Sequence, residues 1–215
     1  MNIVDYLDIA GTFVFAVAGA FRATRHQLDL LGVMVLAVAT GVGGGMIRDM
    51  LIGATPVAAI QSELYLSVCL AGGMVVFLAS DRIATQWNRV MIMDAIGLGV
   101  FAAIGGVKAL EFDLGPIGVM IMAALTATGG GVVRDLLVRE VPAVLRHGFY
   151  ATAALLGGAA LLGADALEWS RLTQIIVAIV TTSGLRFYAM TKGVGLPRVG
   201  VENPEVTTAE QASED

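Results

Sequence analysis

The chain alternates between long uncharged stretches and short charged ones. Seven windows contain no Asp, Glu, Lys or Arg, and they cover residues 9–21, 30–47, 64–80, 95–107, 114–133, 147–164 and 172–185. A helix needs about 20 mostly apolar residues to cross a bilayer. The first, fourth and last windows therefore reach spanning length only if Asp8, Asp94 and Arg186 lie inside the membrane segments. This pattern predicts an all-α integral membrane protein with seven transmembrane helices.

The composition agrees with a membrane protein and excludes several other classes. Of the 215 residues, 57% are hydrophobic and 14% are charged, against about 25% charged in an ordinary globular domain. We therefore expect neither a nucleic-acid-binding protein nor a soluble enzyme. The sequence has no zinc-protease, hydrolase or nucleotide-binding signature, so we expect no catalytic residues, no cofactor and no resident metal. Membrane lipids are the expected surroundings.

The basic residues predict the orientation in the membrane, because cytoplasmic loops carry an excess of Lys and Arg. One set of connections holds Lys108 and Arg171, and the other holds Arg22, Arg25, Arg82, Arg89, Arg139, Arg146, Lys192 and Arg198. The richer set should face the cytoplasm. The N-terminus is then outside the cell membrane and the C-terminus inside, with residues 193–215 forming an acidic, disordered cytoplasmic tail.

An internal repeat with an offset of 86 residues organises the first six windows. The ungapped alignment pairs Asp8 with Asp94, Phe15 with Phe101, Thr40 with Thr126, the triplet of Gly43, Gly44 and Gly45 with Gly129, Gly130 and Gly131, Arg48-Asp49 with Arg134-Asp135, and Gly72 with Gly158. We place repeat one at about residues 3–80 and repeat two at about 89–166. A seventh helix at about 172–190 completes a single transmembrane domain over residues 1–192. Because each copy has three spans, the two copies should be inverted relative to each other.

The glycine triplets lie in the middle of the second and fifth predicted helices. Each glycine costs about 1 kcal/mol relative to alanine in a helix interior, so three in succession predict a kink or a break. Loosened backbone is tolerated in a membrane only where it is buried in protein or lines a watery cavity. The triplets and two flanking threonines are therefore candidates for an ion pathway: Thr40, Gly43, Gly44, Gly45, Thr126, Gly129, Gly130 and Gly131. The alternative is that small residues here only let two helices pack closely.

The charged residues near the triplets have several interpretations. Arg48-Asp49 and Arg134-Asp135 could latch the two helices across the pseudo-two-fold axis, set the electric field at a pore mouth, or extend to the membrane surface. Asp8 and Asp94 could cap the start of the first and fourth helices or attract cations at a pore entrance.

Two copies of Gly-Gly-Gly-x-x-Arg-Asp, in the second and fifth of seven spans, resemble the prokaryotic TRIC family of trimeric intracellular cation channels. The resemblance implies a homotrimer with one hourglass pore in each protomer, passing monovalent cations and chiefly K⁺, and lined by helices two and five kinked at the triplets. The bacterial branch of this family also includes members regarded as small amino-acid transporters, glycine among them. A K⁺ channel is therefore the leading expectation and a carrier for a small zwitterion is the alternative.

Overall fold

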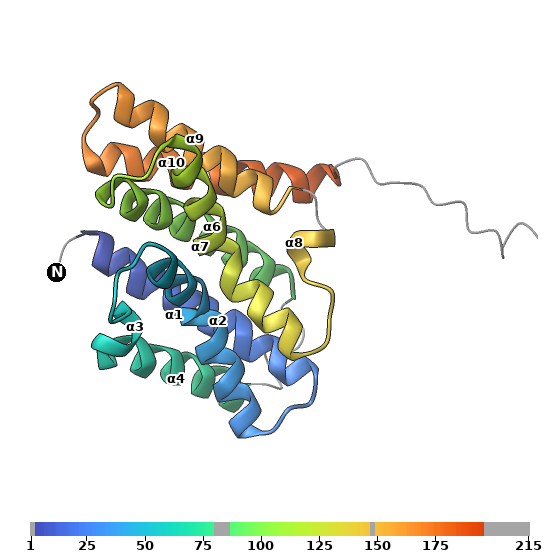
Figure 1. Cartoon of the computed structure of the whole chain (residues 1–215). Helices are drawn as coiled ribbons and strands as arrows, with labels where there is room; N and C mark the ends of the chain where they lie inside the picture. Colours follow the sequence, from blue (N-terminus) through green and yellow to red (C-terminus); the bar gives the residue numbers. More distant parts are fainter. Residues whose placement is uncertain (1–2, 80–86, 147–148, 196–215) are drawn as a thin grey trace, which may run out of the picture.

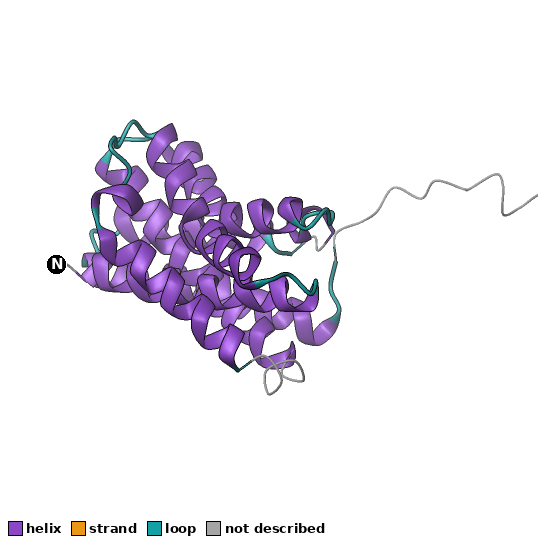
Figure 2. Ribbon diagram, turned by 90° about the horizontal axis from the view of Figure 1, so that it is seen from below, coloured by secondary structure: helices purple, strands orange, loops and turns teal. Residues whose placement is uncertain are grey.

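The computed structural model describes residues 3–79, 87–146 and 149–195, and in these ranges it contains α-helices and loops but no strand (Figures 1 and 2). Most of the acidic tail, residues 196–215, lies outside the described residues. In the first half the helices are α1 (Ile3–Arg25), α2 (Leu30–Leu51), α3 (Ala58–Gln61) and α4 (Glu63–Leu78). The second half has α6 (Trp87–Glu111), α7 (Pro116–Leu137), α8 (Ala143–Arg146), α9 (Ala151–Ala166) and α10 (Arg171–Lys192).

Five helices in the described residues are long and apolar enough to cross a membrane, namely α1, α2, α7, α10 and the Met91–Glu111 part of α6. Helices α4 and α9 are apolar but have 16 residues each. At 1.5 Å per residue such a helix is about 24 Å long, against a hydrocarbon core of about 30 Å. The chain is thus a multi-pass membrane protein. The count of seven spans stays a prediction, because two of the predicted spans are the short helices.

Local sequence signals mark the ends of several helices. The Asp29 carboxylate accepts a hydrogen bond from the Gly32 backbone N–H at 2.8 Å and caps α2, as expected for an N-cap aspartate. Pro116 opens α7, where its missing N–H costs nothing. At the other end of the chain, α10 stops at Gly193, which has a left-handed φ of 63°.

Four helices form the centre of the molecule. Helix α1 packs against α2, α2 against α7, α7 against α6, and α6 against α1, so the four make a closed ring. Helix α4 covers α1 and α2 on one side, while α9 and α10 cover α6 and α7 on the other (Figure 1). The start of α1 and the end of α10 lie at opposite ends of the bundle (Figure 1).

The glycine triplets do not interrupt the helices that contain them. Helix α2 is continuous from Leu30 to Leu51 and α7 from Pro116 to Leu137. The expected break, with two half-helix ends at each triplet, is therefore wrong for this conformation. Both triplets lie where α2 crosses α7, and the close approach of the two backbones there explains the glycines at the contact.

Candidate functional site

The crossing of α2 and α7 is a contact between two backbones. A Cβ on Gly44 would come closer than 3.0 Å to the carbonyl oxygen of Thr126, and a Cβ on Gly130 would do the same to the carbonyl oxygen of Thr40. A Cβ on Gly129 would lie 3.1 Å from the Cα of Gly44. The structure therefore supports the packing interpretation at Gly44, Gly129 and Gly130, where a side chain would push the helices apart. A Cβ on any of the other three triplet glycines would meet no atom closer than 3.5 Å.

The threonines expected to meet a cation are buried in this conformation. The Thr40 hydroxyl donates a hydrogen bond to the Leu36 carbonyl at 2.6 Å, and the Thr126 hydroxyl donates one to the Met122 carbonyl at the same distance. Both threonines are 1% exposed. Because both are buried at the crossing, neither threonine presents an oxygen to an open path in this conformation.

A polar cluster in the first repeat joins five side chains from four helices. Arg48 is 1% exposed, with its Nε 2.9 Å from Asp49 Oδ1 and its Nη2 4.0 Å from Asp8 Oδ2. Tyr65 donates a hydrogen bond to Asp8 at 3.0 Å, which ties α4 to α1. Lys108 Nζ lies 3.0 Å from Asp49 Oδ1, which ties α6 to α2. We call this set the Arg48 cluster.

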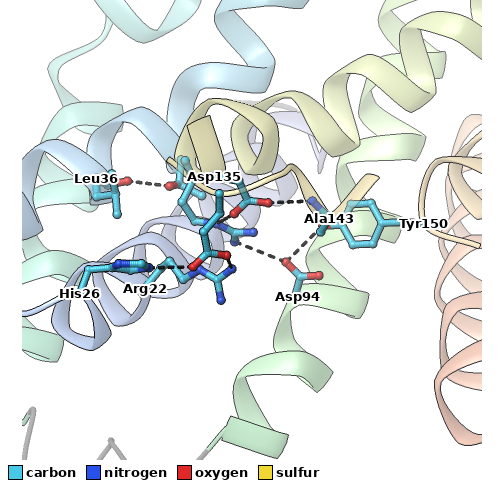
Figure 3. A network of polar contacts seen from close by, with 10 residues as sticks. Arg22, His26, Leu36, Asp94, Asp135, Ala143 and Tyr150 are labelled. Atoms are coloured by element: carbon cyan, nitrogen blue, oxygen red, sulfur yellow. Dashed lines mark hydrogen bonds and ion pairs between the residues drawn. The ribbon is translucent and has the colours of Figure 1, made fainter. Parts of the chain in front are cut away.

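The second repeat contains the matching cluster, which we call the Arg134 cluster (Figure 3). Arg134 Nε lies 2.9 Å from Asp135 Oδ1, and its Nη1 lies 4.0 Å from Asp94 Oδ1. Tyr150 donates to Asp94 at 3.2 Å. The guanidinium of Arg186 from α10 lies over the Tyr150 ring, 4.8 Å from its centroid. Each cluster therefore combines two cations with two carboxylates, so the formal charges cancel.

The sequence alignment of the repeats needs one gap. Asp49 Oδ2 accepts from the Ala58 backbone N–H at 3.1 Å, and Asp135 Oδ2 accepts from the Ala143 N–H at 2.9 Å. These contacts span nine and eight residues respectively, so the loop in repeat two is one residue shorter. The ungapped pairing of Gly72 with Gly158 is consequently wrong.

The contacts of the glycines give the correct register for the third helix of each repeat. A Cβ on Gly73 would meet Met34 and Ala37, whereas a Cβ on Gly158 would meet Met120 and Ala123, which are 86 residues further along. Gly73 therefore matches Gly158.

Two interpretations of the charged residues also change. Asp8 and Asp94 lie inside α1 and α6 rather than at their first residues, so they are not N-caps. Their carboxylates instead contact the arginine and the tyrosine of each cluster.

Each of these arginines forms an ion pair with the aspartate that follows it in the chain. The two pairs do not contact each other across the axis. The links between the repeats are instead Lys108–Asp49 at one end and Arg22–Glu140 at the other, where His26 Nε2 also lies 2.8 Å from Glu140 Oε1 (Figure 3). Of the four residues in these two ion pairs, only Asp49 is one of the predicted latch residues.

Each cluster lines a cavity beside the α2–α7 crossing. Cavity one is lined by Asp8, Thr12, Gly41, Val42, Gly45, Arg48, Asp49, Ala58, Ala59, Tyr65 and Phe101. Cavity two is lined by Thr128, Gly131, Val132, Arg134, Asp135, Ala143, Val144 and Tyr150. Gly45 and Gly131, together with both arginine–aspartate pairs and both tyrosines, occupy matching positions. The two cavities are thus copies of one site, related by the repeat.

The two cavities differ in size, and two repeat-related positions differ in side-chain volume. Cavity one has a volume of about 10 Å³, and cavity two has no room for a water-sized sphere. Thr12 and Gly41 in repeat one correspond to Leu98 and Ala127 in repeat two, and both of the larger side chains are fully buried. Room of about 10–15 Å³ holds one water molecule, so cavity one has space for a single water or a small part of a ligand.

The described residues contain no group of three or more His, Cys, Asp or Glu side chains that could hold a metal ion. Helix α1 and helix α6 supply the aspartates, α2 and α7 supply the arginine–aspartate pairs, and the tyrosines come from the third helix of repeat one and the residue before the third helix of repeat two.

Comparison with known proteins supports the repeat and gives the family. A family model described as "Glycine transporter" matches residues 5–81 and again residues 91–166. A UPF0126 membrane protein of Vibrio cholerae is 42% identical over 199 residues, which cover 91% of this chain and 82% of that protein. The UPF0126 inner membrane protein YadS of Escherichia coli is 41% identical over 158 residues, covering 73% of this chain and 76% of that protein.

Solved structures agree. The TRIC trimeric intracellular cation channel orthologue from Rhodobacter sphaeroides superposes with a TM-score of 0.86 at 35% identity, covering 90% of this chain and all of that one. The chain belongs to the prokaryotic TRIC and UPF0126 membrane-protein family. A second TRIC structure, described as showing the basis of conductance, gives a TM-score of 0.87 at 35% identity and covers 94% of this chain. The TRIC relationship indicates a non-enzymatic membrane protein.

Sequence reasoning missed four members of the clusters as site residues: Tyr65, Tyr150, Lys108 and Arg186. The tyrosines are 85 residues apart, so the ungapped offset of 86 did not align them. A one-residue gap after Pro142 would have paired them and drawn attention to both. Arg186 has no repeat partner, because α10 lies outside the repeat.

Proposed function

We propose that this TRIC-family protein is a passive channel for monovalent cations, chiefly K⁺, with one pathway in each protomer. The pathway runs along the centre of the α1–α2–α7–α6 ring, from cavity one past the crossing at Gly44 and Gly130 to cavity two. Since the two backbones touch at this crossing, the conformation described here is the closed one. Opening requires space along the centre of the ring, which α2 and α7 can provide by bending at their triplets and α1 and α6 by moving apart.

The observation that carries this proposal is the pair of repeat-related polar cavities on either side of one crossing. A membrane protein gains no stability from buried charge unless the charge is paired or functional. Two matched clusters at opposite sides of a ring are the arrangement expected for two entrances to one path. The similar solved structures are described as cation channels, and this supports the same activity here.

Several finer features belong to the same proposal. The chain assembles as a homotrimer in the cell membrane, in contact with lipids, with the N-terminus outside and the C-terminus in the cytoplasm. Thr40, Thr126 and the glycines of both triplets line the open path, and Asp8, Asp94 and the two arginine–aspartate pairs flank it.

Single-channel recording from the purified protein in planar bilayers tests the channel. We expect unitary currents whose reversal potentials in ion gradients follow K⁺ rather than Cl⁻, with K⁺ preferred over Na⁺. Repeated incorporation of folded protein without any unitary current contradicts the proposal.

A carrier for a small zwitterion such as glycine is the second candidate. Arg48 Nη1 is buried beside cavity one and has no hydrogen-bond partner among the described residues. A guanidinium N–H in this state is a donor for a carboxylate, and the matching family model carries the description "Glycine transporter". Saturable glycine uptake and counterflow in proteoliposomes, without electrical conductance, would favour the carrier.

A further inference from the structure

Two phenylalanine rings meet at the centre of the molecule. Phe15 of α1 and Phe101 of α6 have ring centroids 4.9 Å apart and an interplanar angle of 47°. They are 3% and 2% exposed. The two positions are 86 residues apart, so they are the same residue of the two repeats and the contact lies on the pseudo-two-fold axis.

The rings lie on the side of the four-helix ring opposite the glycine crossing. Helices α2 and α7 close one wall through their triplets, whereas α1 and α6 close the facing wall. Phe101 lines cavity one. Phe15 belongs to the same packed cluster as Tyr150, which lines cavity two. Phe101 belongs to that cluster as well, so the apolar packing around the ring pair continues from cavity one to the surroundings of Tyr150.

Glycines position both rings. A Cβ on Gly97 of α6 would come closer than 3.0 Å to the Phe15 ring, and a Cβ on Gly11 of α1 would lie 3.2 Å from Phe101 Cε2. Each ring thus rests on a glycine of the opposite helix. The contact brings α1 and α6 together through two movable side chains, whereas α2 and α7 meet through backbone.

We propose that Phe15 and Phe101 form the hydrophobic gate of the pathway, closed in this structure and opened when α1 and α6 move apart or the rings rotate. An apolar constriction stops ions because a narrow space between hydrocarbon groups does not stay filled with water. The rings are the movable part of the seal, since the glycine crossing has no side chain that could swing aside. This inference rests on the channel function proposed above.

Truncating both rings tests the gate. In planar bilayers, the double variant Phe15→Ala with Phe101→Ala should raise the open probability about tenfold or more over the wild type, because water can then fill the constriction. Phe15→Leu with Phe101→Leu keeps apolar bulk and should stay within about twofold of the wild type. Phe21→Ala is the matched control: it removes an equally buried ring from α1, but that ring packs in the α1–α2–α4 cluster away from the axis.

The outcomes separate the gate from the channel. A wild type that conducts and a folded double alanine variant with the same open probability overturn the gate alone. If neither the wild type nor the double variant gives unitary currents, both the channel and the gate are overturned. If the double variant fails to fold, Phe101→Thr repeats the test with one small polar side chain beside cavity one, and an unchanged open probability for this variant also overturns the gate.

Discussion

At the scale of single residues, the glycines of the two triplets are not equivalent. A Cβ at Gly44 or Gly130 would collide with a backbone carbonyl of the opposite helix, while a Cβ at Gly45 or Gly131 would meet no atom closer than 3.6 Å. Outside the triplets, a Cβ at Gly184 of α10 has nothing within 4 Å. Gly44→Ala and Gly130→Ala should therefore each destabilise the protein by about 1–3 kcal/mol, the usual cost of overpacking. Gly184→Ala should be neutral or slightly stabilising, because alanine favours helix. Thermal melting in detergent measures all three, and equal melting temperatures would contradict the backbone contact.

The different burial of Arg48 and Arg134 predicts that removing each side chain lowers the stability of the protein by a different amount. Arg48 is 1% exposed and Arg134 is 12% exposed at the side chain, and Arg186 lies close to the Arg134 cluster over the Tyr150 ring. Removing one partner of a buried ion pair costs about 3–5 kcal/mol. We expect Arg48→Ala to approach this range and Arg134→Ala to cost less, because water and Arg186 remain near Asp94.

Denaturant or thermal unfolding of both arginine variants checks the order. Lys192→Ala, an exposed residue in the last turn of α10, serves as the control and should change stability by a few tenths of a kcal/mol at most. A larger loss for Arg134→Ala than for Arg48→Ala would be inconsistent with the burial of the two side chains.

At the scale of elements, the two links between the repeats differ in strength. The Asp49 side chain is 2% exposed and contacts Arg48, Lys108 and a backbone N–H. In the other link, the side chains of Glu140 and Arg22 are 32% and 21% exposed. Exposed ion pairs contribute about 0.2–1 kcal/mol. Glu140→Gln should therefore lower stability by no more than about 1 kcal/mol, in a way that salt weakens further, while Asp49→Asn should cost several times more. Melting curves at low and high salt measure both variants.

Hydropathy and the repeat predicted the helices that make the site, but not their contacts. The uncharged windows predicted the positions of α1, α2, α6, α7 and α10, and the offset of 86 residues placed Asp8 and Arg48 in positions matching Asp94 and Arg134.

A run of glycines has two physical outcomes in a membrane, a broken helix or a close crossing, and the outcome depends on which groups the neighbouring helix presents. Here Thr40 and Thr126 present carbonyl oxygens to the glycines, which a single sequence does not reveal. The short helices α3 and α8 have four residues each, which is too few for a helical period of apolar residues to be recognised in the sequence.

At the scale of the whole molecule, the proposed trimer rests on the family relationship and the proposed topology on the basic residues, so the two can be tested separately. Native mass measurement in detergent should give three times the mass of one chain. Reporter fusions at the C-terminus should report the cytoplasm, because the basic residues concentrate on that side. A monomer would contradict the trimer without affecting the proposed path, since the path lies within one four-helix ring.

The inverted repeat also predicts how the current depends on the direction of the voltage. A channel with an exact two-fold axis in the membrane plane would pass equal currents both ways, so any rectification must come from positions where the repeats differ. One such difference is Thr12, which lines cavity one, against its repeat partner Leu98, which is fully buried and does not line cavity two.

Exchanging these residues tests that prediction in one protein. The double variant Thr12→Leu with Leu98→Thr exchanges the polar and the apolar side chain between the two repeats. In channels inserted in one orientation, the sign of rectification should reverse. Thr12→Leu alone adds bulk to cavity one and should make the current more nearly symmetric and smaller. Unchanged rectification in the double variant would mean that these two positions do not lie in series on the conducting path.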